Sequence, residues 1–393
     1  MEFNKSWNEY ILYDLANWKN GLAFKDINFS NKGKPIIKIA ELKNGITEQT
    51  KYTDGDYGEE VYLRKNDLIF SWSGNPKTSI DAFLYDLPEG YLNQHSFKIT
   101  EKKEVVEKYF LYYVLKYLNP MFQSIASDKQ TTGLGHVTIA DLKKIKVRIP
   151  DLEVQYKILN IVKNIDDKIY NNNQINDNLL NLLRASFKKY FIENLKKDWK
   201  EQKLENIVSI RRGASPRPIQ KFLSSEGINW LKISDVTGID SPFIYDIKEK
   251  IIEEGKSKSL FINKGTLVVS NSATPGIPKF IMIDTCVHDG WLVLSNFDYK
   301  YKNYLYFLIE QIRENLIKLA NGSVFNNLKT DILKEYKFYN PDDDTLEKFN
   351  SIAEAMMNMI NKNTTENKHL ESIRDTLLPK LMNGEIDLDK IEI

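Results

Sequence analysis

A helical pattern of apolar residues between Pro150 and about Leu195 constrains this chain more than any other stretch. From Ile158 onward, apolar residues recur at alternating steps of three and four, which places them in one seam along a helix. A helix of about 44 residues would measure roughly 65 Å, about twice the width of a small domain. A single compact domain cannot cover such a seam, so the helix needs a partner.

A second stretch, from Phe349 to Leu381, has the same design. Each expected helix begins just after a Pro-Asp pair, and asparagines interrupt the apolar pattern near its middle. We expect the two seams to bury each other as an antiparallel coiled coil, because chain order favours that arrangement. The alternative is two separate amphipathic helices, each lying on its own globule. The residues predicted to pair are Ile158, Val162, Ile165, Ile169, Leu179, Phe187, Ile352, Met356, Met359, Leu370, Ile373 and Leu377.

The sequence before each helix is repeated. Trp199 and Gly213 follow Trp7 and Gly21 by the same interval (199 − 7 = 192; 213 − 21 = 192). Strand-like runs, a helix expected over 105–126 and another over 302–320 keep this order. The pattern indicates duplication of one unit, a mixed α/β globule followed by a long helix, with a pseudo-twofold relation between copies.

Composition narrows the class of protein without identifying it. The 393 residues are 42% hydrophobic and 28% charged, which is typical of a soluble chain of two or more domains. The net charge of +1 argues neither for nor against nucleic acid. A single cysteine, Cys286, excludes an intrachain disulfide and fits a reducing compartment. No apolar run approaches membrane-spanning length, so we expect a cytoplasmic protein that is not membrane-embedded.

The sequence contains no convincing catalytic or metal site. None of the four histidines has metal-ligand spacing, and no phosphate-binding glycine loop is present. Asn119-Pro120-Met121-Phe122 resembles the Asn-Pro-Pro-Tyr/Phe motif of amino-methyltransferases, but we expect it to end a helix rather than follow a strand. Glu101-x-Lys103 is a still weaker nuclease signal. No catalytic residue and no metal ligand is therefore predicted.

Polar loops occupy equivalent places in the two repeats but carry different side chains. Trp72 aligns with Asn271, and His95 aligns with Asp289. Such loops are often only solvated turns, yet Arg, Lys, Asn and Gln are the residues that contact phosphates and base edges. Two domains that recognise two different DNA sequences would need the same scaffold with different side chains on its loops. The candidate DNA-binding residues are Ser71, Trp72, Asn75, Lys77, Gln94, His95, Lys129, Thr131, Thr132, His136, Arg211, Arg212, Ser215, Arg217, Ser270, Asn271, Ser272 and Thr274.

The chain resembles the specificity subunits of type I restriction-modification systems. The resemblance lies in Ile149-Pro150-x-Leu152-x-x-Gln155-x-x-Ile158, in Ile165-Asp166-Asp167-Lys168-Ile169, and in the ending Leu377-Leu378-Pro379-Lys380-Leu381-Met382-Asn383-Gly384. It covers essentially the whole length. One departure is the entry to the second helix, Asn340-Pro341-Asp342-Asp343-Asp344, which lacks a glutamine at the place of Gln155.

The resemblance implies an α+β fold in which two target recognition domains are joined by the paired helices. The expected boundaries are 1–149 and 199–340 for the recognition domains, with the helices at 150–198 and 341–393. Each domain would read one half of a bipartite, asymmetric target in double-stranded DNA. The helices would separate the domains and dock methyltransferase and restriction/translocase subunits. The chain would bind no cofactor, because S-adenosylmethionine, ATP and Mg are used by those partners.

Two other classes of function stay open at this stage. The chain could be an enzyme in its own right, a DNA methyltransferase or a nuclease. Binding of S-adenosylmethionine or metal-dependent cleavage by the purified chain would favour that reading. It could also be a coiled-coil scaffold that touches only proteins, in which case its assembled complex would not discriminate among DNA sequences.

Overall fold

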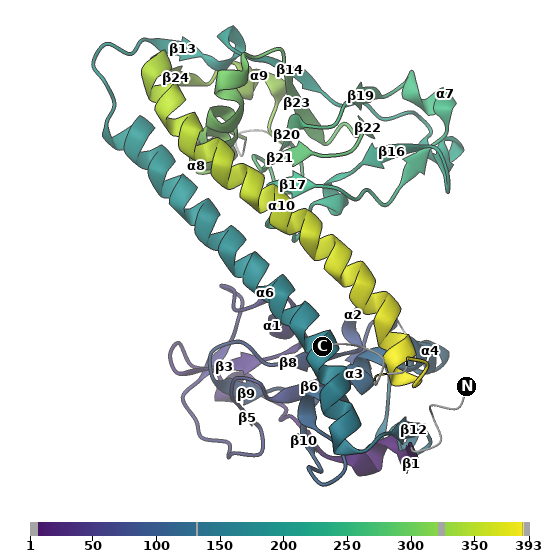
Figure 1. Cartoon of the computed structure of the whole chain (residues 1–393). Coiled ribbons are helices and arrows are strands. Elements are labelled where there is room, and N and C mark those ends of the chain that lie inside the picture. The colour runs from purple at the N-terminus through teal and green to yellow at the C-terminus, as the bar shows by residue number, and fades with distance from the viewer. Residues whose placement is uncertain (1–6, 131–132, 321–326, 387, 389–393) are drawn as a thin grey trace. The chain divides into compact units, whose positions relative to one another are not determined.

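The computed structural model describes residues 7–130, 133–320, 327–386 and 388. The chain divides into two compact units (Figure 1). Unit 1 contains residues 1–168 and 369–393, and unit 2 contains residues 169–368. Each unit therefore combines one globule with a part of each long helix. No helix within the described residues is long and apolar enough to cross a membrane.

Unit 1 is built on a four-stranded antiparallel sheet, and a second sheet contains one parallel pair, β3 (Lys34–Ile37) with β9 (Gly90–Leu92). The first sheet has the order β2 (Ala16–Asn20), β10 (Ser96–Glu101), β6 (Leu68–Ser71), β8 (Asp81–Leu84). The second has the order β4 (Tyr52–Thr53), β3 (Lys34–Ile37), β9 (Gly90–Leu92), β5 (Tyr62–Leu63). Two-stranded pairs join β1 (Asn8–Ile11) with β12 (Lys146–Ile149) and β7 (Ser73–Gly74) with β11 (Gly135–His136). The short helices are α1 (Ile39–Asn44), α2 (Pro76–Ser79) and α5 (Ile139–Leu142).

Unit 2 repeats this plan with one strand more in each sheet. The main sheet has the order β14 (Ser209–Arg212), β23 (Trp291–Ser295), β20 (Thr266–Ser270), β21 (Pro278–Ile281), β17 (Phe243–Ile244). The second has the order β15 (Leu223–Ser224), β18 (Lys250–Ile251), β16 (Ile228–Leu231), β22 (Thr285–Val287), β19 (Leu260–Ile262), in which β16 and β22 are parallel. β13 (Glu201–Lys203) pairs with β24 (Lys337–Tyr339), as β1 pairs with β12. The helices are α7 (Glu253–Lys256), α8 (Lys302–Ala320) and α9 (Thr330–Lys334). The shared strand order confirms the duplication.

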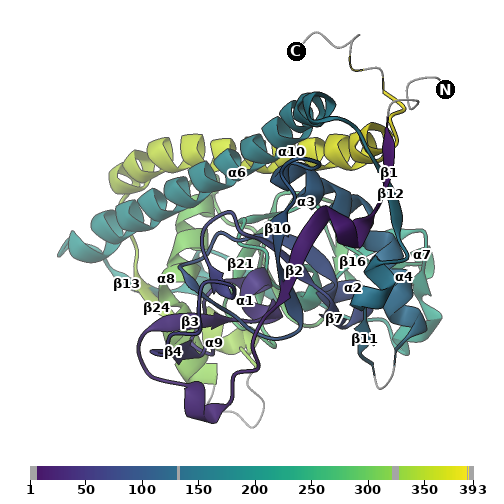
Figure 2. The same ribbon diagram turned by 90° about the horizontal axis from the view of Figure 1, so that it is seen from below.

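The helix expected over 105–126 is two helices. α3 (Lys108–Tyr117) ends at Leu118, and α4 (Asn119–Asp128) begins at once with Pro120 in its first turn. Proline is tolerated there because the first turn's amides need no intrahelical acceptor. The Asn119-Pro120 pair therefore begins a helix, whereas the sequence indicated that it ended one. Figure 2 shows α3 beside the long helices, where the Tyr113 hydroxyl donates to Asp166 of the first long helix at 2.5 Å.

The two long helices are α6 (Leu152–Lys188), followed by a π-helical turn at Lys189–Glu193, and α10 (Asp343–Met382). The Pro-Asp pairs act as helix starts. The Asp151 carboxylate accepts from the Val154 amide at 3.0 Å, and the Asp342 carboxylate accepts from the Thr345 amide at 2.9 Å. Each aspartate thus caps a backbone donor that the first turn leaves unpaired.

Both helices are continuous through their asparagines, which pair across the helices instead of breaking them. Within unit 2, the Asn172 amide donates to Asn367 at 2.8 Å, and the Asn363 amide donates to Asn176 at 2.9 Å. The partners' numbers have a constant sum (172 + 367 = 539; 176 + 363 = 539), so the helices run antiparallel. The two pairs are also copies of each other (363 − 172 = 191; 367 − 176 = 191), so the pseudo-twofold relation exchanges them.

The same antiparallel register continues in unit 1. There Arg374 of α10 donates to Asp166 of α6 at 2.8 Å (166 + 374 = 540). Apolar residues of both helices join the globule's core: Ile158, Leu159, Val162, Leu378, Leu381 and Met382. In unit 2 the corresponding contact is aromatic, with Phe187, Phe191 and Phe349 around Tyr304 and Phe307 of α8.

The buried seam differs in detail from the predicted one. Ile158, Val162 and Phe187 are buried, whereas Met359 and Ile373 are 50% and 48% exposed. Those two assignments are wrong, because Met357, Ile360 and the amide of Asn367 occupy the inner positions of α10. An apolar count cannot detect a buried amide, and the helix's 3.6-residue turn drifts against a seven-residue repeat. The other predicted residues are partly buried: Ile165, Ile169, Leu179, Ile352, Met356, Leu370 and Leu377.

Candidate nucleic-acid interface

The loops predicted in the first repeat meet around Trp72. This residue lies between β6 and β7, where its backbone amide donates to the His95 carbonyl at 3.1 Å and its carbonyl accepts from the Val137 amide at 2.8 Å. The pairing of β7 with β11 brings Ser73 opposite His136, and their side chains are 2.9 Å apart. Residues more than 60 positions apart in the chain therefore form one surface (136 − 73 = 63).

Aromatic packing holds this surface, which we call the Trp72 cluster: Trp72, His95, Phe97 and His136. The ring of Trp72 lies 5.4 Å from His95, 5.7 Å from Phe97 and 5.9 Å from His136. Its indole nitrogen donates to the Asn20 side chain at 2.9 Å. Burial, reinforced by the nearby His136, lowers the pKa of His95. The cluster therefore offers an aromatic surface with hydrogen-bonding edges, suited to base edges and thymine methyl groups.

Other candidates of the first repeat are occupied in structural roles. The Asn75 side chain caps α2 by accepting from the Lys77 and Thr78 amides at 3.1 and 3.2 Å. Lys129 pairs with the buried carboxylate of Asp141 at 2.5 Å. Ser71 is fully buried, while Gln94 and Lys77 are exposed. Thr131 and Thr132 lie outside the described residues.

In the second repeat the candidates gather around Asp289, at the turn that aligns with His95. The Asp289 carbonyl accepts from Arg212 at 2.8 Å and from the Asn271 amide group at 3.1 Å. Its carboxylate accepts from Ser215 at 2.8 Å and from Arg217 at 3.4 Å. We call this group the Asp289 cluster: Arg212, Ser215, Arg217, Asn271, His288 and Asp289.

Electrostatics keeps the Asp289 carboxylate charged. Burial by itself would raise its pKa, but the hydrogen bond from Ser215 and the nearby charges of His288, Arg212 and Arg217 lower that pKa below its ordinary value. Burial is also the main reason that the pKa of His288 is lowered, although Asp289 opposes the shift. The second turn is therefore ionic where the first is aromatic.

A basic hollow of about 700 Å³ adjoins the Asp289 cluster. Its lining includes four cationic side chains, from Arg211, Arg212, Lys329 and Lys334, against one acidic residue, Asp331. Asn271 is 2% exposed and also lines the hollow. A concave surface with an excess of positive charge is suited to the phosphates of a nucleic-acid backbone.

The remaining candidates of the second repeat shape a turn. Ser270 is fully buried, and its hydroxyl donates to the Thr274 carbonyl at 2.5 Å and accepts from the Ile277 amide at 2.9 Å. The Thr274 amide donates to the Ser272 carbonyl at 2.7 Å. Ser272 is partly buried, and Thr274 is exposed.

The sequence did not single out Asp289, Lys329, Lys334, Asn20 or Phe97 as site residues. Asp289 was aligned with His95, but an acidic residue among basic loops gave no signal for DNA binding. The helix α9 carries Lys334 and follows Lys329, and its role becomes visible only where it lines the hollow beside β14. The repeat alignment was the one signal that could have pointed to Asp289.

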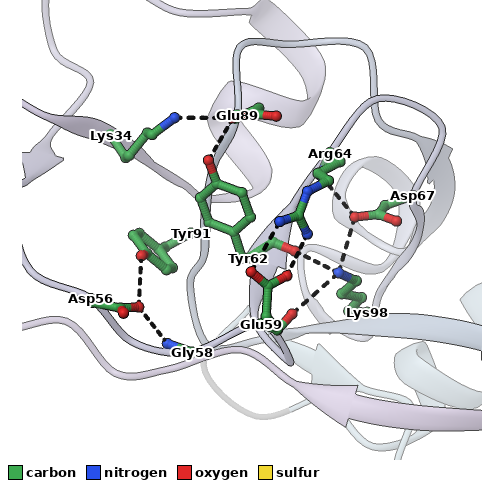
Figure 3. A network of polar contacts seen from close by, with 10 residues as sticks. All are labelled: Lys34, Asp56, Gly58, Glu59, Tyr62, Arg64, Asp67, Glu89, Tyr91 and Lys98. Atoms are coloured by element: carbon green, nitrogen blue, oxygen red, sulfur yellow. Dashed lines mark hydrogen bonds and ion pairs between the residues drawn. The ribbon is translucent and has the colours of Figure 1, made fainter.

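Basic residues are not equally available across the molecule. Figure 3 shows another polar network of unit 1, near β5 and β9, in which the cationic side chains form ion pairs with carboxylates. The Tyr62 hydroxyl also donates to Glu89 at 2.6 Å there. These cations are neutralised locally and are poorly suited to hold phosphates. The pairs are Lys34–Glu89 at 3.1 Å, Arg64–Glu59 at 2.5 Å and Lys98–Asp67 at 3.1 Å.

Within the described residues, no three His, Cys, Asp or Glu side chains are grouped so that they could hold a metal ion. Cys286 is buried, and burial raises the pKa of its thiol.

Comparison with known proteins places both repeats in one family. A sequence model described as "Type I restriction modification DNA specificity domain" matches residues 4–181 and again residues 196–375. The MjaIX specificity subunit of Methanocaldococcus jannaschii is 23% identical, over 91% of this chain and 94% of the relative. The HindI specificity subunit of Haemophilus influenzae is 21% identical, over 97% of this chain and 99% of the relative.

A solved structure shares the fold. The S subunit of a type I restriction-modification system from M. genitalium aligns with a TM-score of 0.60 at 17% identity. The alignment covers 97% of this chain and 98% of that one. At this identity the similarity supports the architecture, two mixed α/β globules with two long helices, and does not identify residues.

Proposed function

This chain belongs to the type I restriction-modification DNA specificity family, and on that premise we propose that it is the DNA-specificity subunit of such a complex, with each repeat reading one half of a bipartite target. The observation that carries the proposal is the pair of equivalent turns at His95 and Asp289. The Trp72 amide donates to the His95 carbonyl, and the aligned Asn271 amide donates to the Gly290 carbonyl at 2.8 Å. One scaffold thus presents two unlike surfaces, as an asymmetric target requires.

The candidate residues of the two clusters are the proposed contacts to double-stranded DNA. Arg211 and the lysines of the hollow suit phosphates, whereas the Trp72 cluster suits base edges. The chain's net charge of +1 supports weak DNA affinity for the isolated chain, because phosphate contacts dominate non-specific binding. Methyltransferase subunits would then supply the additional contacts in the assembled complex.

The long helices are the proposed docking surface for the methyltransferase and restriction/translocase subunits. Support comes from large apolar side chains that they leave exposed. Tyr156 is 58% exposed and Leu182 is 53% exposed, and such side chains recur along both helices. The others are Tyr170, Ile175, Met359 and Ile373.

Catalysis is proposed to reside in the partner subunits. The chain would bind neither S-adenosylmethionine nor ATP nor Mg, and it would act in the cytoplasm. Calorimetry of the purified chain with each ligand would detect binding if the chain were itself a methyltransferase or a nuclease. Binding with saturable heat would contradict the proposal.

A domain exchange tests the reading of half-sites. Residues 1–149 are replaced by the matching region of a relative with another target, and the chain is expressed with its methyltransferase subunits. Mapping of methylated adenines should show one changed half-site, with the other half unchanged. Exchange of residues 199–340 is the matched control and should change the opposite half. A change in both halves, or in neither, would refute the modular reading.

A further inference from the structure

The turn at Asp289 holds two arginines in different ways. Arg212 donates through its Nε to the Asp289 carbonyl at 2.8 Å, and its guanidinium lies 3.9 Å from the carboxylate. Arg217 donates to the carboxylate itself at 3.4 Å. The Arg217 side chain is 81% exposed, whereas the Asp289 side chain is only 28% exposed. Asp289 therefore lies beneath an arginine that projects into solvent.

Asp289 is itself fixed from several sides. Ser215 donates to one carboxylate oxygen at 2.8 Å, and the His288 ring lies 3.0 Å from that same oxygen. The Asn271 side chain donates to the Asp289 carbonyl, and the Asn271 backbone amide donates to the carbonyl of the next residue, Gly290. The carboxylate is thus fixed in position, and its contact with the Arg217 guanidinium restricts how that side chain can rotate.

Of the four cations that line the neighbouring hollow, only Arg212 is held by Asp289. Within the part of the chain that the structure describes, Arg211, Lys329 and Lys334 form no ion pair with a carboxylate. Arg211 precedes Arg212 on β14 and is exposed. Two neighbouring arginines of one strand therefore differ in how their side chains are held.

This difference separates two kinds of DNA contact. A phosphate attracts any nearby cation and tolerates rotation of the side chain, so a carboxylate beside that cation only weakens the attraction. Reading a guanine requires the guanidinium fork to align with two acceptors, O6 and N7, so an orienting carboxylate improves the fit. Arg217 has the geometry of a base reader, and Arg211 has that of a phosphate contact.

We propose that Arg217, oriented by Asp289, reads a guanine in the half-site bound by the second repeat, while Arg211, Lys329 and Lys334 hold phosphates. This inference rests on the proposed function. Asp289 is a positioning residue, because it acts through Arg217. The second half-site accordingly contains a G·C pair at the position that Arg217 reaches.

The test uses the full chain assembled with its methyltransferase subunits. Arg217→Lys keeps the charge but removes the fork, and Arg211→Ala is the matched control on the phosphate side. Methylated adenines are mapped, and binding to oligonucleotides with single base changes is measured at several salt concentrations. Arg217→Lys should relax one guanine of the second half-site, with about 5- to 150-fold less discrimination there. The first half-site and the spacer should not change.

Arg211→Ala should weaken binding to all sequences alike and reduce the salt slope by about 1. Asp289→Asn should relax the same guanine as Arg217→Lys, since the neutral amide orients the arginine less firmly. An unchanged motif in Arg217→Lys, or a uniform loss like that of Arg211→Ala, would overturn the inference. A wild-type complex without sequence preference would instead overturn the proposed function. Thermal unfolding of each variant verifies that it is folded.

Discussion

The turns at His95 and Asp289 occupy the same place in the two repeats, and each is held by a backbone hydrogen bond from the residue that follows a central strand. The acceptor is His95 in the first repeat and Gly290, the neighbour of Asp289, in the second. His95 adopts a left-handed conformation with φ of 79° and contacts the ring of Trp72. Asp289 instead binds cationic and hydroxyl side chains. Backbone hydrogen bonds do not depend on the identity of the side chains, so they preserve the shape of the turn while its side chains differ between the repeats.

The largest expected effect tests whether the two units depend equally on their long helices. Phe187 is 1% exposed and packs against four aromatic rings, so Phe187→Ala should cost unit 2 about 3–5 kcal/mol. Leu378 in the matching stretch of α10 is 9% exposed, and Leu378→Ala should cost about 2 kcal/mol. Denaturant unfolding measures both. Equal losses of unfolding free energy in the two variants would show that the aromatic packing gives unit 2 no additional stability.

A smaller effect is expected at the tip of the first repeat. Trp72→Ala should cost about 2–3 kcal/mol, because the half-buried indole loses three ring contacts and the hydrogen bond to Asn20. Asn271→Ala, at the aligned position, should cost about 1 kcal/mol, since it removes one side-chain hydrogen bond. Each variant should also relax only its own half-site. Relaxation of the opposite half-site would contradict independent reading.

The paired asparagines provide a comparison within the helices. Asn172→Leu removes hydrogen bonds to both Asn367 and Glu366, whereas Asn176→Leu removes one bond, to Asn363. Asn172→Leu removes the donor to the Asn367 side-chain oxygen, and Asn176→Leu removes the acceptor of the Asn363 amide group, with an expected loss of about 1–3 kcal/mol that is larger for Asn172. The double variant Asn176→Leu with Asn363→Leu should recover most of the loss. Chemical denaturation of the two single variants and the double variant provides the test, and an additive double loss would argue against pairing.

The helix starts are expected to give the smallest effects. Asp151→Ala and Asp342→Ala should each cost about 1 kcal/mol, because each removes an N-cap. For Asp342, the hydrogen bond from Lys196 is the main cause of a lowered pKa, helped by Trp199 and Thr345 and opposed by burial.

A lowered carboxyl pKa has a defined effect on acid stability. The Asp342 contribution is complete above the ordinary value of 3.8 and is lost as pH falls through the lower folded value. Asp342→Asn should therefore flatten the loss of stability below about pH 4. Unfolding followed between pH 7 and pH 2 would measure this, and an unchanged acid slope would contradict the role of Asp342.

Much of the architecture was predictable from local spacing. The Pro-Asp pairs at Pro150 and Pro341, which stand 191 positions apart, marked both helix starts (341 − 150 = 191). Proline excludes an intrahelical donor and aspartate caps the next turn, so these residues act wherever the chain places them. The predicted helix over 302–320 coincides with α8.

The exact seam was not predictable in the same way. Met359 looked apolar in the sequence but is half exposed, while Asn367 is 6% exposed. Burial of an amide is favourable only when a partner across the helices satisfies it, and hydrophobic periodicity contains no information about that partner.

The sequence by itself determined the duplication, the long helices and the family, because each depends on residue types at fixed intervals along the chain. Only the tertiary structure decided which polar residues act together. Ser73 and His136 meet through the pairing of β7 with β11, and Arg217 meets Asp289 across 72 positions of sequence (289 − 217 = 72). A charge or a ring acquires its role from the neighbours that folding supplies, and those neighbours lie far away in the sequence.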